Sequence, residues 1–98
     1  MSNDLSCRYD TRASFYGKAK TISKNISGGS MLSLYSYDTM VAYIQFYENK
    51  IIYNYCGKYS QTTTRHQKEF FKQAGLVDKE IKELFKNGKL EKGDYNEN

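Results

Sequence analysis

The chain of 98 residues contains no proline, one histidine and only two cysteines, Cys7 and Cys56. Without X-Pro bonds, no proline isomerisation slows folding, and turns depend on glycine, asparagine and serine. A single histidine excludes a His-pair metal site, and two cysteines without further ligands do not make a zinc site. We therefore expect no metal, no cofactor and two reduced thiols.

Long apolar runs are also missing. No stretch of 18 apolar residues is present, so we expect no membrane-spanning helix. The first thirty residues lack the apolar core of a signal peptide. These two absences predict a cytoplasmic protein.

Tyrosine and positive charge are abundant. The chain has ten tyrosines and a net charge of +4. Residues 11–75 hold nine Lys/Arg against three acids, which gives +6, so the charge belongs to the body of the chain. A basic, tyrosine-rich body favours a polyanionic partner, either nucleic acid or an acidic protein surface. A solvated basic surface without a partner is the alternative.

Hydrophobic periodicity predicts one α+β domain. Alternation or β-rich composition indicates four strands, and two later stretches have helical spacing. The expected strands cover residues 12–22, 31–35, 41–47 and 51–56, and the expected helices cover residues 62–74 and 78–87. We predict a four-stranded antiparallel β-meander followed by two α-helices packed on one sheet face. We expect a flexible N-terminus at 1–10, a single domain at 11–88 and a disordered tail at 89–98.

The helix starts carry capping residues. Thr64 and Gln67 have the spacing of a capping box, while Thr62 or Thr63 could cap the first helix instead. Asp78 is expected to cap the second helix.

The clearest strand separates two kinds of side chain. Val41, Tyr43, Gln45 and Tyr47 lie opposite Ala42, Ile44 and Phe46. Exposed tyrosines beside Lys18 and Lys20 would form a stacking platform with cations, which suits single-stranded nucleic acid. The same residues would also suit a protein interface. Cross-strand aromatic pairing, with a homodimer through this face, is the structural alternative.

A second candidate site lies where the last expected strand gives way to the first helix. Hydroxyls, cations and backbone donors gather there, as an anion site requires. The residues concerned are Lys58, Tyr59, Ser60, Thr62, Arg65, His66, Lys68 and Lys72. The alternative is a helix cap, with His66 packed against Phe70.

Catalysis fits the sequence poorly, and we predict that the protein is not an enzyme. A triad of Ser60, His66 and Asp38 would place its nucleophile in a helix cap. A metal-independent ribonuclease built from His66, Arg65, Lys58 and Tyr59 is chemically more reasonable and stays as an alternative.

Residues 35–76 resemble a family of small uncharacterised proteins of bacteriophages and mobile elements. The resemblance is carried by the residues from Tyr35 to Ala42 and from Lys58 to His66, followed by Phe70 and Phe71. It implies a phage product acting in the cytoplasm of a low-GC Gram-positive host. Small phage proteins of this kind often inhibit host defence. We therefore predict a binding protein that inhibits a defence effector, such as a CRISPR ribonucleoprotein, with a phage nucleic-acid-binding accessory protein as the alternative.

Overall fold

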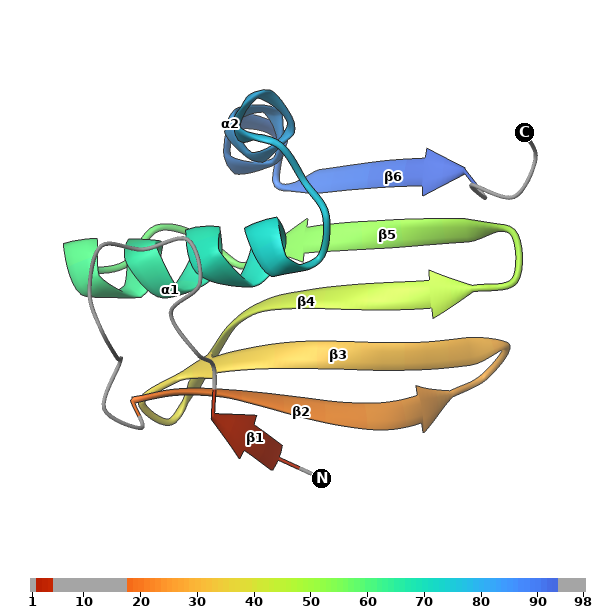
Figure 1. Cartoon of the computed structure of the whole chain (residues 1–98), viewed down its shortest axis with the longest axis horizontal. Helices are drawn as coiled ribbons and strands as arrows, with labels where there is room; N and C mark the ends of the chain where they lie inside the picture. The colour runs from red at the N-terminus through yellow and green to blue at the C-terminus, as the bar shows by residue number, and fades with distance from the viewer. Residues whose placement is uncertain (1, 5–17, 94–98) are drawn as a thin grey trace.

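The computed structural model describes residues 2–4 and 18–93 of the chain. Its strands form a single antiparallel sheet in which neighbours in sequence are neighbours in space (Figure 1). The elements in chain order are β1 (Ser2–Asp4), β2 (Ala19–Ile26), β3 (Gly29–Ser36), β4 (Thr39–Tyr47), β5 (Lys50–Tyr55), α1 (Gln61–Gln73), α2 (Asp78–Asn87) and β6 (Lys89–Gly93).

The α+β class is confirmed, but the predicted number of strands is wrong. The sheet has six strands, because β1 and β6 add to the expected four. Residues 89–93, expected in a disordered tail, form β6 and pair with β5. Residues 2–4, expected in a flexible N-terminus, pair with β2. The expected strand at 12–22 is described only from Ala19, where it continues to Ile26; residues 5–17 and 94–98 lie outside the described residues.

The register of the sheet defines its two faces. Leu34, Ala42 and Tyr55 lie opposite one another across β3, β4 and β5, so they share a face. Ser33, Tyr43 and Asn54 share the other face in the same way. Successive side chains of a strand alternate between faces, and therefore the rest of each strand can be assigned.

One irregularity interrupts this alternation in β4. Leu34 pairs with Ala42 whereas Tyr35 pairs with Met40, so Val41 is the extra residue of a β-bulge. The side chain of Val41 is buried, although alternation alone would place it with Tyr43 on the opposite face. The predicted grouping of Val41 with the tyrosines is therefore wrong.

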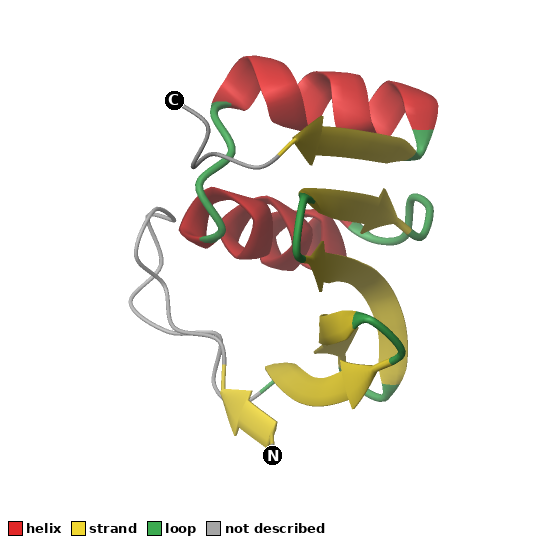
Figure 2. Cartoon of the chain, turned by 90° about the vertical axis from the view of Figure 1, so that its right-hand side faces the viewer, coloured by secondary structure: helices red, strands yellow, loops and turns green. Residues whose placement is uncertain are grey.

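The hydrophobic core joins one face of the sheet to both helices. The ring of Tyr53 meets that of Phe71 edge-on at 6.5 Å, and Tyr55 stacks on Phe85 at 4.3 Å. Ile44 lies on this face and is fully buried in the same cluster. The sheet curls between its two edges, with the helices beside it (Figure 2). We call this face the core face, and the opposite one the tyrosine face.

Helix α1 begins one residue earlier than predicted. Its N-cap is Ser60, whose hydroxyl oxygen accepts a hydrogen bond from the Thr63 backbone N–H at 3.2 Å. Gln67, predicted to complete a capping box with Thr64, is instead buried. Its Nε2 donates to the backbone carbonyls of Val41 and Gly57, at 2.9 and 3.1 Å. This side chain holds α1 against the bulge of β4.

Helix α2 has Val77 rather than Asp78 at its N-cap. Valine has no side-chain acceptor, so only half of a capping box forms: Glu80 Oε1 accepts from the Val77 backbone N–H at 3.0 Å. Asp78 instead pairs with Lys72 of α1, Nζ to Oδ1, at 3.1 Å. The helix ends at Gly88, whose φ of 83° is the left-handed conformation that glycine adopts most easily.

Candidate binding surface

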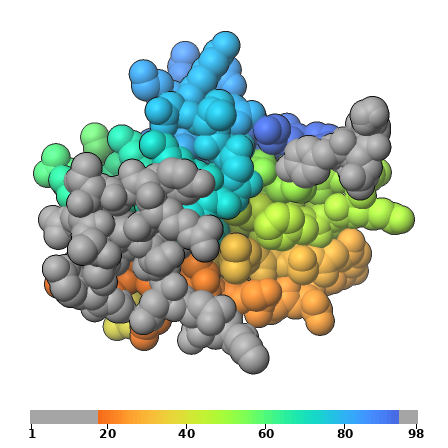
Figure 3. Space-filling model, in the orientation of Figure 1, coloured from red at the N-terminus to blue at the C-terminus, as the bar shows by residue number. Residues whose placement is uncertain are grey.

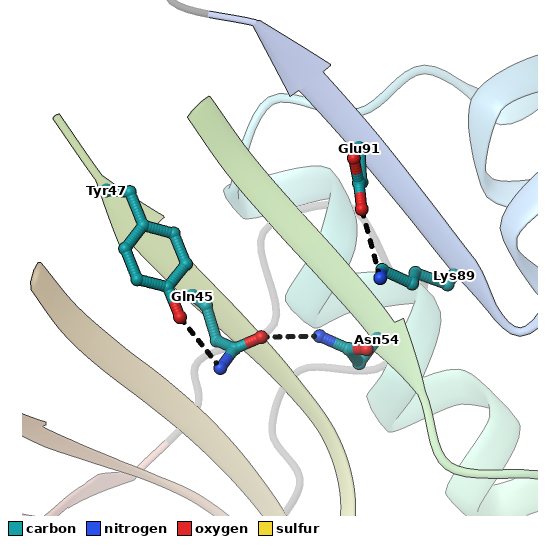
Figure 4. Close-up of polar contacts among 5 residues, drawn as sticks. All are labelled: Gln45, Tyr47, Asn54, Lys89 and Glu91. Carbon is teal, nitrogen blue, oxygen red and sulfur yellow. Dashed lines mark hydrogen bonds and ion pairs between the residues drawn. The ribbon is translucent and has the colours of Figure 1, made fainter. Parts of the chain in front are cut away.

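The tyrosine face lies opposite the core face. Tyr35 of β3 and Tyr43 and Tyr47 of β4 project from it, and all three are half-buried. Seen from this side, the helices lie behind the sheet (Figure 4). The rings therefore stand on the surface that the two helices leave uncovered.

The side-chain amides of Gln45 and Asn54 form a row of hydrogen bonds on the tyrosine face. Gln45 Nε2 donates to the hydroxyl of Tyr47 at 3.2 Å, and Asn54 Nδ2 donates to Gln45 Oε1 at 3.5 Å (Figure 4). This row crosses from β4 to β5. Gln45 therefore connects the Tyr47 hydroxyl to Asn54.

Lysines flank the tyrosines on both sides. Lys20 and Lys24 of β2 are exposed on one side, and Lys50 and Lys89 lie toward the other. An acid, Glu91, also lies on this face and pairs with Lys89 at 3.0 Å. This hydrogen bond lowers the pKa of Glu91, with further help from the charges of Lys89 and Lys50.

A hollow of about 300 Å³ opens at one end of the tyrosine face. It is lined by Lys20, Ile22, Tyr35, Tyr37 and Asp38, which come from β2, β3 and the turn between β3 and β4. Aromatic rings, a lysine ammonium and a carboxylate thus line the same open hollow.

Tyr37 of this turn has an unusual backbone. Its φ is 59°, a value that bulky residues rarely adopt, and its side chain remains 52% exposed. The backbone N–H of Tyr37 donates to the Lys18 carbonyl at 2.7 Å, and the Lys18 ammonium lies 5.9 Å from the ring centroid. The turn therefore presents an aromatic ring and a cation together.

The predicted anion site at the start of α1 is mainly a helix cap. Ser60 caps the helix, and the Thr64 hydroxyl donates to the Ser60 carbonyl at 3.1 Å. His66 is 1% exposed, and its Nδ1 lies 2.9 Å from the hydroxyl of Ser36 on β3. The ring of His66, predicted to contact a partner, is thus enclosed by the protein in this structure.

The remaining predicted residues of this junction lie on its outer side. Lys58, Tyr59 and Lys68 are exposed, and the Tyr59 hydroxyl reaches the Cys56 carbonyl at 3.5 Å. Thr62 and Arg65 are partly buried. Lys72 is engaged by Asp78, so it is not a free cation.

The predicted binding residues lie on two different surfaces. Tyr43, Tyr47 and Lys20 belong to the tyrosine face, whereas Lys58, Tyr59 and Lys68 lie around α1, which packs on the core face. The side chains of α1 and α2 adjoin each other on the helical side of the molecule (Figure 3). A hollow of about 450 Å³ lies there, lined by Lys68, Asp78, Ile81, Lys82 and Phe85.

The described residues offer little for catalysis. Ser60 bonds to Thr63 rather than to His66, so the drawn triad does not form. The hydroxyl that does meet His66 belongs to Ser36 and is buried with it, and a phosphate of a ribonuclease substrate has no approach to that pair. Burial raises the pKa of the Cys56 thiol, which disfavours the nucleophilic thiolate. No cluster of His, Cys, Asp or Glu in the described ranges could hold a metal ion.

Sequence reasoning missed three residues of the tyrosine face and its hollow. Lys24 lies beyond the strand expected at 12–22, and Tyr35 is the last residue of the strand expected at 31–35. Tyr37 lies between the strands expected at 31–35 and 41–47, where the sequence indicates a bend or a bulge. An aromatic residue where a turn normally takes glycine or asparagine was the signal that could have singled it out.

A model of a protein family of unknown function, DUF8033, matches residues 3–88 of the chain. The chain belongs to this family. The DUF8033 match takes in both candidate surfaces except for Lys89 and Glu91, because it ends just before β6. No curated protein and no solved structure matches the chain. Neither described helix is long and apolar enough to cross a membrane.

Proposed function

We propose that this protein is a non-catalytic binding protein that acts through its tyrosine face, and that its target is a bacterial defence effector. The observation that carries the proposal is the row of Tyr35, Tyr43 and Tyr47 on the face opposite the helices. Tyrosines that are partly exposed on a rigid sheet lose little conformational freedom on binding, and they are favoured interface residues.

The surrounding charge supports a partner of opposite sign. Lys20 and Lys24 stand beside the tyrosines, and the basic body of the chain would attract an acidic surface or a nucleoprotein. The resemblance to small phage proteins supports a host defence system as the target, with a CRISPR ribonucleoprotein as the first one to test.

The test is a pull-down from a bacterial host lysate with tagged protein, with and without nuclease. Retained proteins are identified by mass spectrometry and retained nucleic acids by sequencing. We expect a defence effector to be enriched. A Tyr43→Ala/Tyr47→Ala variant should lose it while keeping a cooperative unfolding transition.

The matched control changes the other surface. Tyr59→Ala/Lys68→Ala also removes a tyrosine and a cation, but from residues around α1. It should retain the partner. Loss of capture in the control alone would move the contact to the helical side. Unimpaired CRISPR interference in cells that contain folded protein, across several effector types, would overturn the choice of target.

A further inference from the structure

We infer that the tyrosine face binds single-stranded nucleic acid, with bases stacked on its rings and phosphates on its lysines. The inference rests on the proposed function, because it uses the same surface, and it specifies the chemistry of the partner. A nucleoprotein effector would supply such a strand as its guide or as a displaced target strand.

The tyrosines are placed for separate stacking contacts. Tyr43 and Tyr47 lie four residues apart on one strand, about 13 Å at the usual rise per residue. Tyr35 of β3 lies diagonally across from Tyr43, which pairs directly with Ser33. Three rings on two central strands therefore offer successive positions for unpaired bases, a use of sheet aromatics that does not depend on sequence.

Polar groups lie between the rings. The amide of Gln45 sits between Tyr43 and Tyr47 along β4 and is linked to Asn54. Side-chain amides carry both donors and acceptors, as the edges of bases do. A protein interface of the same area would favour a drier, more apolar centre.

The charge of the face complements a phosphate backbone. Lys20, Lys24, Lys50 and Lys89 lie on this face, together with Glu91, which is already paired with Lys89, and with Asp38 at the hollow. The lysines lie on the two flanks of the tyrosine row, where the backbone of a strand crossing the sheet would pass.

The hollow at the end of the face suits a terminal or splayed nucleotide. Its volume is about 300 Å³, and Tyr35 and Tyr37 supply aromatic walls. Lys20 lines it, and Lys18 lies beside the ring of Tyr37. Asp38 adds an acceptor for the amino group of a base.

The experiment is fluorescence anisotropy with the full chain and labelled oligonucleotides. The probes are oligo-dT, oligo-U and a duplex of matched length, each titrated over a range of salt concentrations. We expect both single strands to bind more tightly than the duplex. Tyr47→Leu, which keeps apolar area but removes the ring, should weaken binding by about 5- to 100-fold.

A second variant keeps the test informative if the tyrosine substitution harms folding. Lys20 and Lys24 are exposed, so replacing both with serine should leave the fold intact. Each phosphate contact on a single strand contributes about 0.7 to the slope of log K against log salt. The double variant should therefore reduce that slope by about 1.4. Tyr59→Leu is the control and should bind like the unchanged protein.

The outcomes separate this inference from the proposed function. No binding to either single strand, together with a partner that survives nuclease in the pull-down, would overturn the inference and leave a protein partner on this face. Equal binding to duplex and single strand, unaffected by Tyr47→Leu, would also overturn it. Failure of both oligonucleotide binding and pull-down would remove the proposed function as well.

Discussion

The hydroxyl of Ser36 lies 2.9 Å from Nδ1 of His66, thirty residues away in the chain and buried with it. The same hydroxyl lies 3.1 Å from Oγ1 of Thr63. One residue at the end of β3 thus joins the first and second turns of α1 to the sheet. The chain's one histidine is part of this junction between α1 and the sheet.

Ser36→Ala is predicted to destabilise the protein. The substitution removes a hydrogen-bond partner from two buried side chains, and such losses cost about 1–3 kcal/mol in the free energy of unfolding. Urea unfolding followed by circular dichroism measures it. Ser23→Ala is the control, because Ser23 shares the core face but is exposed, and it should change stability by less than about 0.5 kcal/mol. Equal effects of the two variants would remove the proposed role of Ser36.

Glu80→Gln is predicted to weaken the attachment of α2 to β6. Glu80 accepts from the Val77 backbone, and its Oε2 lies 2.8 Å from Lys92 Nζ. These contacts, led by the Lys92 hydrogen bond, lower the pKa of Glu80 below its usual value. The loss at neutral pH should be about 0.5–1 kcal/mol, because only the partly exposed ion pair with Lys92 is removed, while the glutamine oxygen can still accept from the Val77 backbone.

The pH dependence of this variant has a defined sign. A carboxyl whose pKa is lower in the folded state stabilises the fold above its unfolded pKa, and this contribution is lost as pH falls through the folded value. The stability difference between the unchanged protein and Glu80→Gln should therefore shrink on acidification. Glu83→Gln, on the exposed side of the same helix, should show no such pH-dependent difference in the free energy of unfolding. If the stability difference between the unchanged protein and Glu80→Gln stayed constant from neutral to acid pH, the lowered pKa of Glu80 would be contradicted.

Two substitutions of Tyr37 can measure how much its backbone conformation costs in the free energy of unfolding. Tyr37→Gly and Tyr37→Ala both remove the ring, but only glycine adopts a φ near 59° without a Cβ penalty. We expect the glycine variant to be more stable than the alanine variant by about 1 kcal/mol. Both should lose affinity at the hollow if its aromatic wall binds a base. Alanine as stable as glycine would show that the turn relaxes.

Gly29→Ala is predicted to disrupt the β3–β4 pairing. A Cβ at this position would lie 1.9 Å from the Phe46 carbonyl oxygen, which is backbone and cannot rotate away. Overpacking costs about 1–3 kcal/mol, and so close a contact with backbone should cost an amount at the upper end of this range. Gly93→Ala is the matched control in β6, where the added methyl meets nothing within 4 Å. Thermal unfolding of the two variants compares them directly, and similar melting temperatures would contradict the prediction.

The tyrosine face was partly predictable. Alternation along β4 correctly separated Tyr43, Gln45 and Tyr47 from Ala42 and Ile44, because side-chain direction in a strand depends only on position. Such a pattern does not show whether the cations near α1 share a surface with these tyrosines. Deciding this required knowing which sheet face the helices cover, and the structure puts the two groups on different sides.

The sequence by itself determined the elements that depend on local patterns: the amphipathic helices α1 and α2 and the alternating strands from β3 to β5. It also contains no metal-ligand pattern. Only the tertiary structure decided the bulge at Val41, the pairing of Ser36 with His66, and the addition of Lys89–Gly93 as a sixth strand. Each of these depends on a contact between distant segments. Local periodicity does not encode such contacts, because their energy arises only when packing brings the partners together.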